Sequence, residues 1–296
     1  MTAKHRFGLS KSRIASFEQC PKRLWLSVHR PECGQQEGAA ARFATGHGVG
    51  EIACALLPDG VMIEAVPDLA AALAATQALL DKGDRPIFEA TFQHDGVLVR
   101  VDVLQPDGAG GWHIAEVKSS TRAKDYHLAD LATQIWVVRN SGVPVSSAAI
   151  RHTNSGFVLE REGAFDGLFT DTHLMAAAEP LVAGRGEIVA AAREVLHHTE
   201  LEISPGSHCD APFSCEFAGY CNAALPVGPE WPVTILPNGG GKRWIEQGVV
   251  DLLAVAPGAL TNPTHQRVWH ATVSGQLFHD PAKARAEIES WAFPRT

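Results

Sequence analysis

Three consecutive segments that alternate apolar and polar residues constrain the fold of this 296-residue chain more than any other feature. They span residues 86–92, 97–104 and 112–119. Alternation with a period of two is typical of β-strands that bury one face, so we predict three neighbouring strands. The turn-rich segment 105–111 joins the second strand to the third, which favours an antiparallel pair.

Helical periodicity marks much of the remaining chain. We predict helices from Ser10 and over residues 39–57, 68–82, 125–141 and 171–198, with further strands at 61–64 and 145–153. In the last part of the chain we predict a helix near 243–253, a strand near 267–274 and a helix over 281–291. A mixture of strands and helices of this kind predicts an α/β protein.

Proline and glycine residues mark a boundary late in the chain. Four prolines fall between Pro226 and Pro237, and glycines follow at 239–241. Such residues interrupt regular structure, so we predict one domain over residues 1–225, a linker over 226–241 and a small α/β extension over 242–296. With 45% hydrophobic and 20% charged residues, a chain of this length can bury a core without covalent staples.

The six cysteines are interpreted from the compartment that the sequence predicts. No run of 18 apolar residues occurs, and the basic N-terminus lacks the apolar stretch of a signal peptide. We therefore expect a cytoplasmic protein with no membrane segment. Disulfides are rare in the cytoplasm, so the cysteines favour a metal or cluster site.

Charge is unevenly distributed along the chain. The formal net charge is −8, which does not suit a general nucleic-acid coat. Residues 1–30, in contrast, contain seven lysines and arginines and a single acid, Glu18. A local basic arm of this kind either contacts phosphates or forms a solvated helix face, and the sequence leaves both interpretations open.

Charged residues lie inside two of the predicted strands. Asp102 lies in the second strand, and Glu116 and Lys118 lie in the third. Because side chains alternate along a strand, Glu116 and Lys118 share one face and Val117 turns into the core. A turn between antiparallel strands would bring Asp102 beside Glu116. Two adjacent carboxylates repel each other unless a cation lies between them, and oxygen ligands favour Mg²⁺ or Mn²⁺.

This combination has the parts of a phosphodiester-cleaving site. A bound cation lowers the pKa of water, and Lys118 would orient that water or neutralise the phosphate. Glu89 on the preceding strand, Gln134 on the following helix and His47 as a further metal ligand complete the prediction. The alternative is an exposed Glu116–Lys118 ion pair of little energetic value, with Glu89, Gln134 and His47 in ordinary structural positions.

The cysteines supply a second constellation. Cys209, Cys215 and Cys221 are spaced C-x₅-C-x₅-C, which is wider than the usual spacing of structural zinc sites. We predict Cys20 as the fourth ligand, with Cys33 as its alternative. Four thiolates favour an iron–sulfur cluster or zinc, and the alternative of buried reduced thiols is less consistent with three cysteines so close together.

The two constellations together resemble the RecB-like nucleases that carry an iron–sulfur cluster, a group that includes CRISPR-associated nucleases and the nuclease lobe of bacterial helicase–nucleases. In that group one cysteine lies near the N-terminus and three follow the nuclease core. The residues that fall in the family's order are Cys20, Gly46-His47, Glu89, Asp102, Glu116-Val-Lys118, Gln134, Cys209, Cys215 and Cys221. The resemblance covers about residues 9–222.

The segments SKSRIASFEQCPKRLWLSVHRPE, GHGVGEIA and EVKSSTRAKDYHLADLATQ look more specifically like a bacterial family whose members carry a second, ribonuclease H-like exonuclease domain. That second domain would begin near the end of this chain, so we expect either a truncated or a stand-alone form. Two departures are visible: Val138 stands where the family helix has Tyr, and the PD pair reads Val101-Asp102.

The resemblance implies a PD-(D/E)XK restriction-endonuclease-like core, a mixed sheet flanked by helices, with a cluster that staples its N- and C-terminal segments. It implies Asp102, Glu116, Lys118, Glu89 and Gln134 as catalytic residues, His47, Asp102 and Glu116 as Mg²⁺ or Mn²⁺ ligands, and Cys20, Cys209, Cys215 and Cys221 as ligands of a 4Fe–4S cluster.

The expected activity is cleavage of DNA, on single strands or ends, in repair, recombination or defence. A protein partner or a second nuclease domain is expected to act through the C-terminal region. The alternatives are a non-catalytic nucleic-acid-binding or interaction module that contains the cluster, and a structural zinc protein.

Overall fold

The computed structural model describes residues 8–35, 48–64, 68–225 and 228–291. The chain divides into two compact units, Met1–Asn222 and Ala223–Thr296, and each is described by itself. The division lies close to residue 225, where the sequence predicts the end of the first domain. His47 lies outside the described residues, so its predicted role as a metal ligand stays a prediction.

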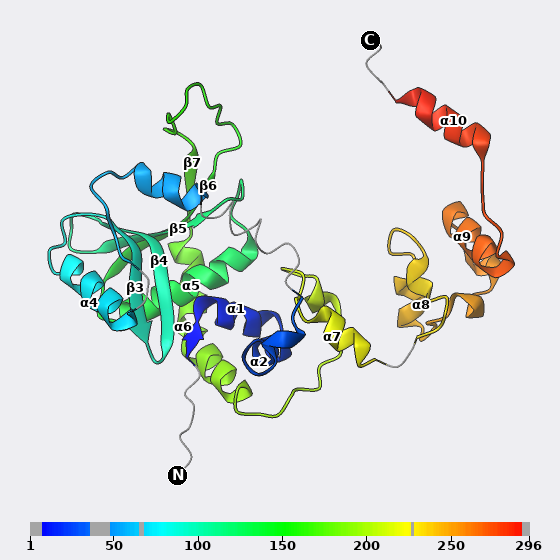
Figure 1. The fold of residues 1–296 in the computed structure, drawn as a ribbon, viewed down its shortest axis with the longest axis horizontal. Helices are drawn as coiled ribbons and strands as arrows, with labels where there is room; N and C mark the ends of the chain where they lie inside the picture. The colour runs from blue at the N-terminus through cyan, green and yellow to red at the C-terminus, as the bar shows by residue number, and fades with distance from the viewer. Residues whose placement is uncertain (1–7, 36–47, 65–67, 226–227, 292–296) are drawn as a thin grey trace. The chain divides into compact units, whose positions relative to one another are not determined.

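A mixed seven-stranded sheet forms the centre of the first unit (Figure 1). The strands are β1 (Leu9–Ser10), β2 (Val61–Met62), β3 (Ile87–His94), β4 (Val97–Pro106), β5 (Trp112–Lys118), β6 (Val145–Thr153) and β7 (Phe169–His173). Their order is β2-β3-β4-β5-β6-β7, with β1 paired to β4. The β3–β4, β4–β5 and β6–β7 pairs are antiparallel, and the others are parallel. The predicted trio of strands is confirmed as β3, β4 and β5.

Helices flank this sheet, which confirms the predicted α/β class. The helices that contact its strands are α1 (Lys11–Gln19), α4 (Leu69–Leu80), α5 (Asp125–Asn140) and α6 (Met175–Val195). The chain also forms α2 (Pro21–His29) and α7 (Ala218–Ala223), and residues 48–55 are helical as well. The Ser10 side chain accepts from the Arg13 N–H and caps α1, and Asp68 caps α4 in the same way. The predicted helix over 171–198 is corrected, because its first residues belong to β7 and the helix begins at Met175.

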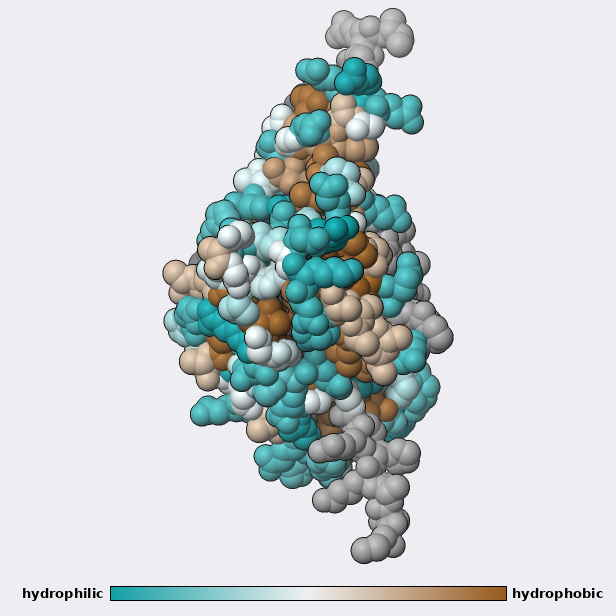
Figure 2. All heavy atoms as spheres, turned by 90° about the vertical axis from the view of Figure 1, so that its left-hand side faces the viewer, coloured by the Kyte–Doolittle hydropathy of each residue, from teal (hydrophilic) through white to brown (hydrophobic). Residues whose placement is uncertain are grey.

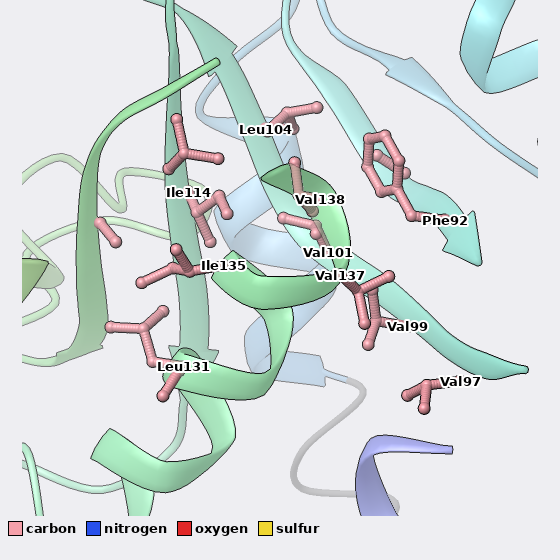
Figure 3. Close-up of a cluster of buried hydrophobic side chains, with 14 of the residues drawn as sticks. Phe92, Val97, Val99, Val101, Leu104, Ile114, Leu131, Ile135, Val137 and Val138 are labelled. Atoms are coloured by element: carbon pink, nitrogen blue, oxygen red, sulfur yellow. The ribbon is translucent and has the colours of Figure 1, made fainter. Parts of the chain in front are cut away.

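The main core lies between the sheet and helices α5 and α6. Alternate residues of β4, Val97, Val99 and Val101, share one face of the strand, and Figure 3 shows Val99 and Val101 beside Val137 and Val138 of α5. All five side chains are at most 1% exposed. Each buried side chain of this size contributes roughly 1.5–3 kcal/mol to folding, so α5 is firmly fixed on the sheet.

A smaller apolar cluster covers the other face of the central strands. It contains Phe88, Val103 and Ala115, and the partly buried Cys54 and Leu57 pack against it. Strands β3, β4 and β5 are therefore buried on both faces where the polar residues of the candidate site interrupt them. A buried polar group in such a position needs hydrogen-bond or charge partners.

The N-terminal helices are tied to the far end of the same unit. The Trp25 indole N–H donates to the His198 carbonyl at 2.9 Å, and Lys22 Nζ lies 2.9 Å from Glu200 Oε1. A ring nitrogen of His29 lies 3.0 Å from the Leu196 carbonyl, 167 residues along the chain. These contacts bring α2 against the segment that leads to the three late cysteines.

The second unit has a small core of its own, formed by Val233, Leu236, Leu252, Val255 and Leu260. Its elements are η3 (Val233–Ile235), α8 (Lys242–Glu246), η4 (Leu252–Ala254), η5 (Pro257–Ala259), α9 (Pro263–Ser274) and α10 (Pro281–Ser290). The first two core residues lie in the predicted linker 226–241. The predicted strand near 267–274 is wrong, because these residues form the second half of α9.

The surface is of mixed polarity. On the face drawn in Figure 2, hydrophilic and apolar side chains are interspersed, as on most folded proteins. Among the described residues, no helix has both the length and the apolar character needed to cross a membrane.

Candidate active site

The predicted carboxylates come together where β4 and β5 meet. Val103 pairs with Ala115, so the same antiparallel register places Asp102 opposite Glu116. Val117 packs with the small apolar cluster on the other face of the sheet, and alternation then directs Glu116 and Lys118 toward the side of the main core. The structure therefore places both carboxylates and Lys118 in one neighbourhood.

Glu116 is the centre of a hydrogen-bond network. Its side chain is buried, and the whole residue is 1% exposed. Oxygen Oε1 accepts from Lys118 Nζ at 2.5 Å and from Lys11 Nζ at 2.5 Å, while Oε2 accepts from Gln134 Nε2 at 2.7 Å. The predicted residue Gln134 is thus in direct contact with the carboxylate. Charge-assisted bonds of this kind are short and strong, so they fix the position of the carboxylate.

Asp102 is held by the neighbouring strand rather than by a side chain. Its Oδ2 accepts the backbone N–H of Val117 at 2.7 Å. Burial raises the pKa of Asp102, and the negative charge of Glu116 raises it further. This carboxyl therefore resists ionisation as long as no additional cation is bound beside it.

Glu116 has the opposite electrostatic balance. Burial acts to raise the pKa of Glu116, but the ammonium groups of Lys11 and Lys118 outweigh it and hold that pKa well below its ordinary value. Burial likewise acts to lower the pKa of Lys118, and Glu116 more than compensates, so that pKa is raised. The site consequently contains one firmly ionised carboxylate next to one that ionises reluctantly.

Lys11 and Asp130 belong to this site and were not predicted from the sequence. Lys11 is the first residue of α1, and its only sequence signal is its place in the basic arm. Asp130 lies on α5 with its Oδ2 3.8 Å from Lys118 Nζ. It precedes Gln134 by four residues, a helical spacing that places both on one face and could have identified Asp130.

The donor atoms around Glu116 decide whether a divalent cation fits this site. In the described part of the chain, no three His, Cys, Asp or Glu side chains gather closely enough to hold a metal ion. Asp102 and Glu116 nevertheless match Mg²⁺, which often binds through one or two carboxylates with water and substrate phosphate as its other ligands. Gln134 Oε1 is also buried with no hydrogen-bond partner among the described residues, so an acceptor remains available.

Glu89 lies beside Asp102 without a hydrogen bond to it among the described contacts. Phe88 pairs with Val103, so Glu89 lies opposite Asp102 on β3. Its φ of 53° is in the left-handed region, which non-glycine residues rarely adopt and which concentrates at functional sites. Burial raises the pKa of Cys54 to about 11, with Glu89 and Asp102 acting in the same direction. Glu89 therefore adds negative charge to this neighbourhood.

Val138 marks the departure from the family's helix motif. It is fully buried in the main core rather than directed at the site. The apolar residue at this position therefore serves packing and takes no part in the described hydrogen bonds of Glu116.

The four predicted ligand cysteines line one pocket. Cys20 lies at the junction of α1 and α2, and Cys209, Cys215 and Cys221 come from the late segment. Cys33, the alternative ligand, is not among the described residues that line the pocket. Burial raises the pKa of both Cys215 and Cys221, which favours their neutral thiols. Four cysteines are the donor type and number that a 4Fe–4S cluster or a zinc ion takes, but their side chains do not gather closely enough in the described structure to form such a site.

Two solved structures are similar to this chain at low identity. No family model and no curated protein matches the chain. The crystal structure of SSO0001 matches at 12% identity with a TM-score of 0.36, over 76% of this chain and 90% of that one. An alkaline exonuclease from Laribacter hongkongensis matches at 12% identity with a TM-score of 0.26, over 64% of this chain and 91% of that one. Because both TM-scores are below 0.5, neither similarity assigns a fold or a function.

Proposed function

We propose that this chain is a metal-dependent deoxyribonuclease of the RecB-like PD-(D/E)XK type, acting on single strands or ends. The observation that supports it most is the buried Glu116 carboxylate, which contacts Lys118, Lys11 and Gln134 and lies opposite Asp102. A structural ion pair does not require a second, reluctantly ionised carboxyl beside it. A cation site does.

Each residue has a defined role in this proposal. Asp102 and Glu116 hold the Mg²⁺ or Mn²⁺ ion, which when bound supplies an activated water and stabilises charge on the phosphoryl oxygen. Lys118 positions the attacking water or the phosphate from the same face of β5. Gln134 holds Glu116 in its orientation through the bond to Oε2.

The test is cleavage of labelled single-stranded DNA in Mn²⁺. We expect Lys118→Ala to lower the rate by about 100-fold or more, the size of effect seen when one charge-stabilising donor is removed. Lys82→Ala, which removes an exposed lysine beyond the end of α4, should cleave like the wild type. Equal cleavage by the Lys118 variant would reject the proposed site, and EDTA should abolish cleavage by all three proteins.

We further propose that Cys20, Cys209, Cys215 and Cys221 bind a structural 4Fe–4S cluster. Their common pocket supports this proposal. Protein purified without oxygen should absorb near 400 nm and contain iron, and Cys215→Ala should lose both signals. Zinc in elemental analysis with no such absorbance would instead identify a structural zinc protein.

One observation favours a second candidate, a non-catalytic nucleic-acid-binding module. Two ammonium groups already satisfy Glu116 Oε1, so the network is electrostatically balanced as it stands. In this case DNA would bind equally well with and without EDTA, and no divalent ion would support turnover.

A further inference from the structure

A groove in the first unit connects the candidate active site to the cysteine segment. One of its walls is α1, from Lys11 to Gln19, and another is the start of α5, with Tyr126 and Asp130. Phe213, which lies between Cys209 and Cys215, lines its far end. Lys11, which lines the groove, also contacts Glu116, so a single side chain links the groove to the carboxylate that the proposed chemistry uses.

Two aromatic rings meet in this groove. The Tyr126 and Phe213 centroids are 4.7 Å apart at an interplanar angle of 66°. Phe213 is 40% exposed, which is high for a phenylalanine that packs against another ring. The ammonium of Lys124 lies 5.6 Å from the centroid of Tyr126. Exposed rings beside cations are the usual components of a surface on which unpaired bases stack.

Hydrogen bonds fix the backbone at Phe213. Gln19 Nε2 donates to the Phe213 carbonyl at 2.7 Å and to the His208 carbonyl at 2.8 Å. Arg23 Nη1 in turn donates to Gln19 Oε1 at 2.5 Å, and its guanidinium pairs with Glu216. The backbone that carries Phe213 is therefore held against the end of α1.

The charges of the groove indicate which part of a nucleic acid it accepts. Glu18 lines the groove, and so does Asp130, whose Oδ2 lies 3.8 Å from Lys118 Nζ. A phosphate placed against these carboxyls would meet a poor environment, whereas a neutral base would not. The exposed Lys124, whose ammonium lies against the Tyr126 ring, suits a phosphate next to such a base.

We propose that this groove binds an unpaired nucleobase of a single strand, which stacks on Tyr126 and Phe213 next to the cleaved bond. The identity of the ligand rests on the proposed function. A base that is paired in a duplex is not available to stack in this groove. The chain would therefore select single-stranded nucleic acid over duplex.

The experiment measures binding without cleavage. A single-stranded oligonucleotide that contains 2-aminopurine is titrated with protein in EDTA, and both anisotropy and 2-aminopurine emission are recorded. We expect Phe213→Ala and Tyr126→Ala each to weaken binding about tenfold and to change the emission of the bound base. Tyr126→Phe, which keeps the ring, should bind like the wild type. Phe278→Ala, which removes an exposed ring from the second unit, should do the same.

The outcomes separate this inference from the proposed function. If the protein cleaves DNA but neither alanine substitution changes its binding or the 2-aminopurine emission, the proposed base-binding groove is wrong and the proposed nuclease activity stands. Ring-dependent binding without any turnover supports the groove and overturns the nuclease. Absence of single-strand binding by the wild type, or preference for duplex over single strand, overturns the groove as well.

Discussion

Two lysines share a single oxygen of Glu116, and this arrangement has a direct consequence for cation binding. The ammonium of Lys11 lies 2.5 Å from Oε1, close to the place where a divalent ion would contact the same carboxylate. We therefore expect Lys11→Met to bind Mn²⁺ about tenfold more tightly than the wild type, because a competing positive charge has been removed. Electron paramagnetic resonance of free Mn²⁺ measures this affinity without any substrate.

The control for this prediction retains the charge. Lys11→Arg should bind Mn²⁺ with about the affinity of the wild type, since a guanidinium still competes for Glu116. Unchanged or weaker Mn²⁺ binding by Lys11→Met would show that the ammonium and the cation do not compete.

His127 couples the stability of α5 to pH. Burial lowers its pKa to about 4, and the ammonium of Lys118 acts in the same direction. The ordinary value in an unfolded chain is about 6.5, so this contribution to stability is fully present above pH 6.5 and is lost as pH falls toward 4. His127→Gln should remove about 1 kcal/mol of the decrease in unfolding free energy between pH 6.5 and pH 5, because solvent screens part of the effect at this half-buried ring. Urea denaturation at the two pH values measures it, and parallel losses in both proteins would refute it.

The sequence predicted part of this residue-scale picture. Asp102, Glu116 and Lys118 could be grouped because strand alternation and one short turn fix their relation, and Gln134 followed from the family's order. Lys11 could not be predicted, because its contact with Glu116 spans 105 residues and depends on how α1 docks on the sheet. The roles of all these residues in catalysis stay predictions.

At the scale of elements, the turn before β2 has room only for a glycine at position 60. A Cβ built on Gly60 would lie 2.1 Å from the Cζ atom of Phe88, whose ring packs behind the candidate site. We expect Gly60→Ala to destabilise the first unit by about 1–3 kcal/mol through overpacking. Urea denaturation provides the measurement.

A second glycine provides a matched control with the opposite sign. Gly184 lies inside α6, and its added Cβ would meet no atom within 4 Å. Gly184→Ala should therefore stabilise the unit by about 0.5–1 kcal/mol. Equal effects of the two substitutions would contradict the packing argument at Gly60.

Element types were predictable where the periodicity was long and consistent. Strands β3 to β6 and helices α4 and α5 follow this rule. The second half of α9, Arg267–Ser274, misled the prediction because apolar residues alternate there, whereas Asn262 as cap and Pro263 at the first helical position indicate a helix. Strand β7 was missed because its Thr-Asp-Thr sequence is polar and acquires its order by pairing with β6.

At the scale of the whole molecule, two separate cores predict two unfolding transitions. Leu252 is fully buried in the core of the second unit, and Leu131 is fully buried in that of the first. Leu252→Ala should cost about 2–5 kcal/mol and lower only the transition of the second unit, and Leu131→Ala should lower only the other. Scanning calorimetry tests this. A single transition that shifts with either substitution would show that the units unfold together.

The contacts of α2 with the late segment also bear on how the protein is made. Its partner at Leu196 is synthesised 167 residues after His29. At roughly 5–20 residues per second, the helix leaves the ribosome about ten to thirty seconds before that partner exists. Cys20, at the start of the same helix, likewise waits for Cys209, Cys215 and Cys221. The N-terminal helices therefore spend that interval without their final neighbours, and the cysteine pocket is completed only as synthesis of the first unit ends.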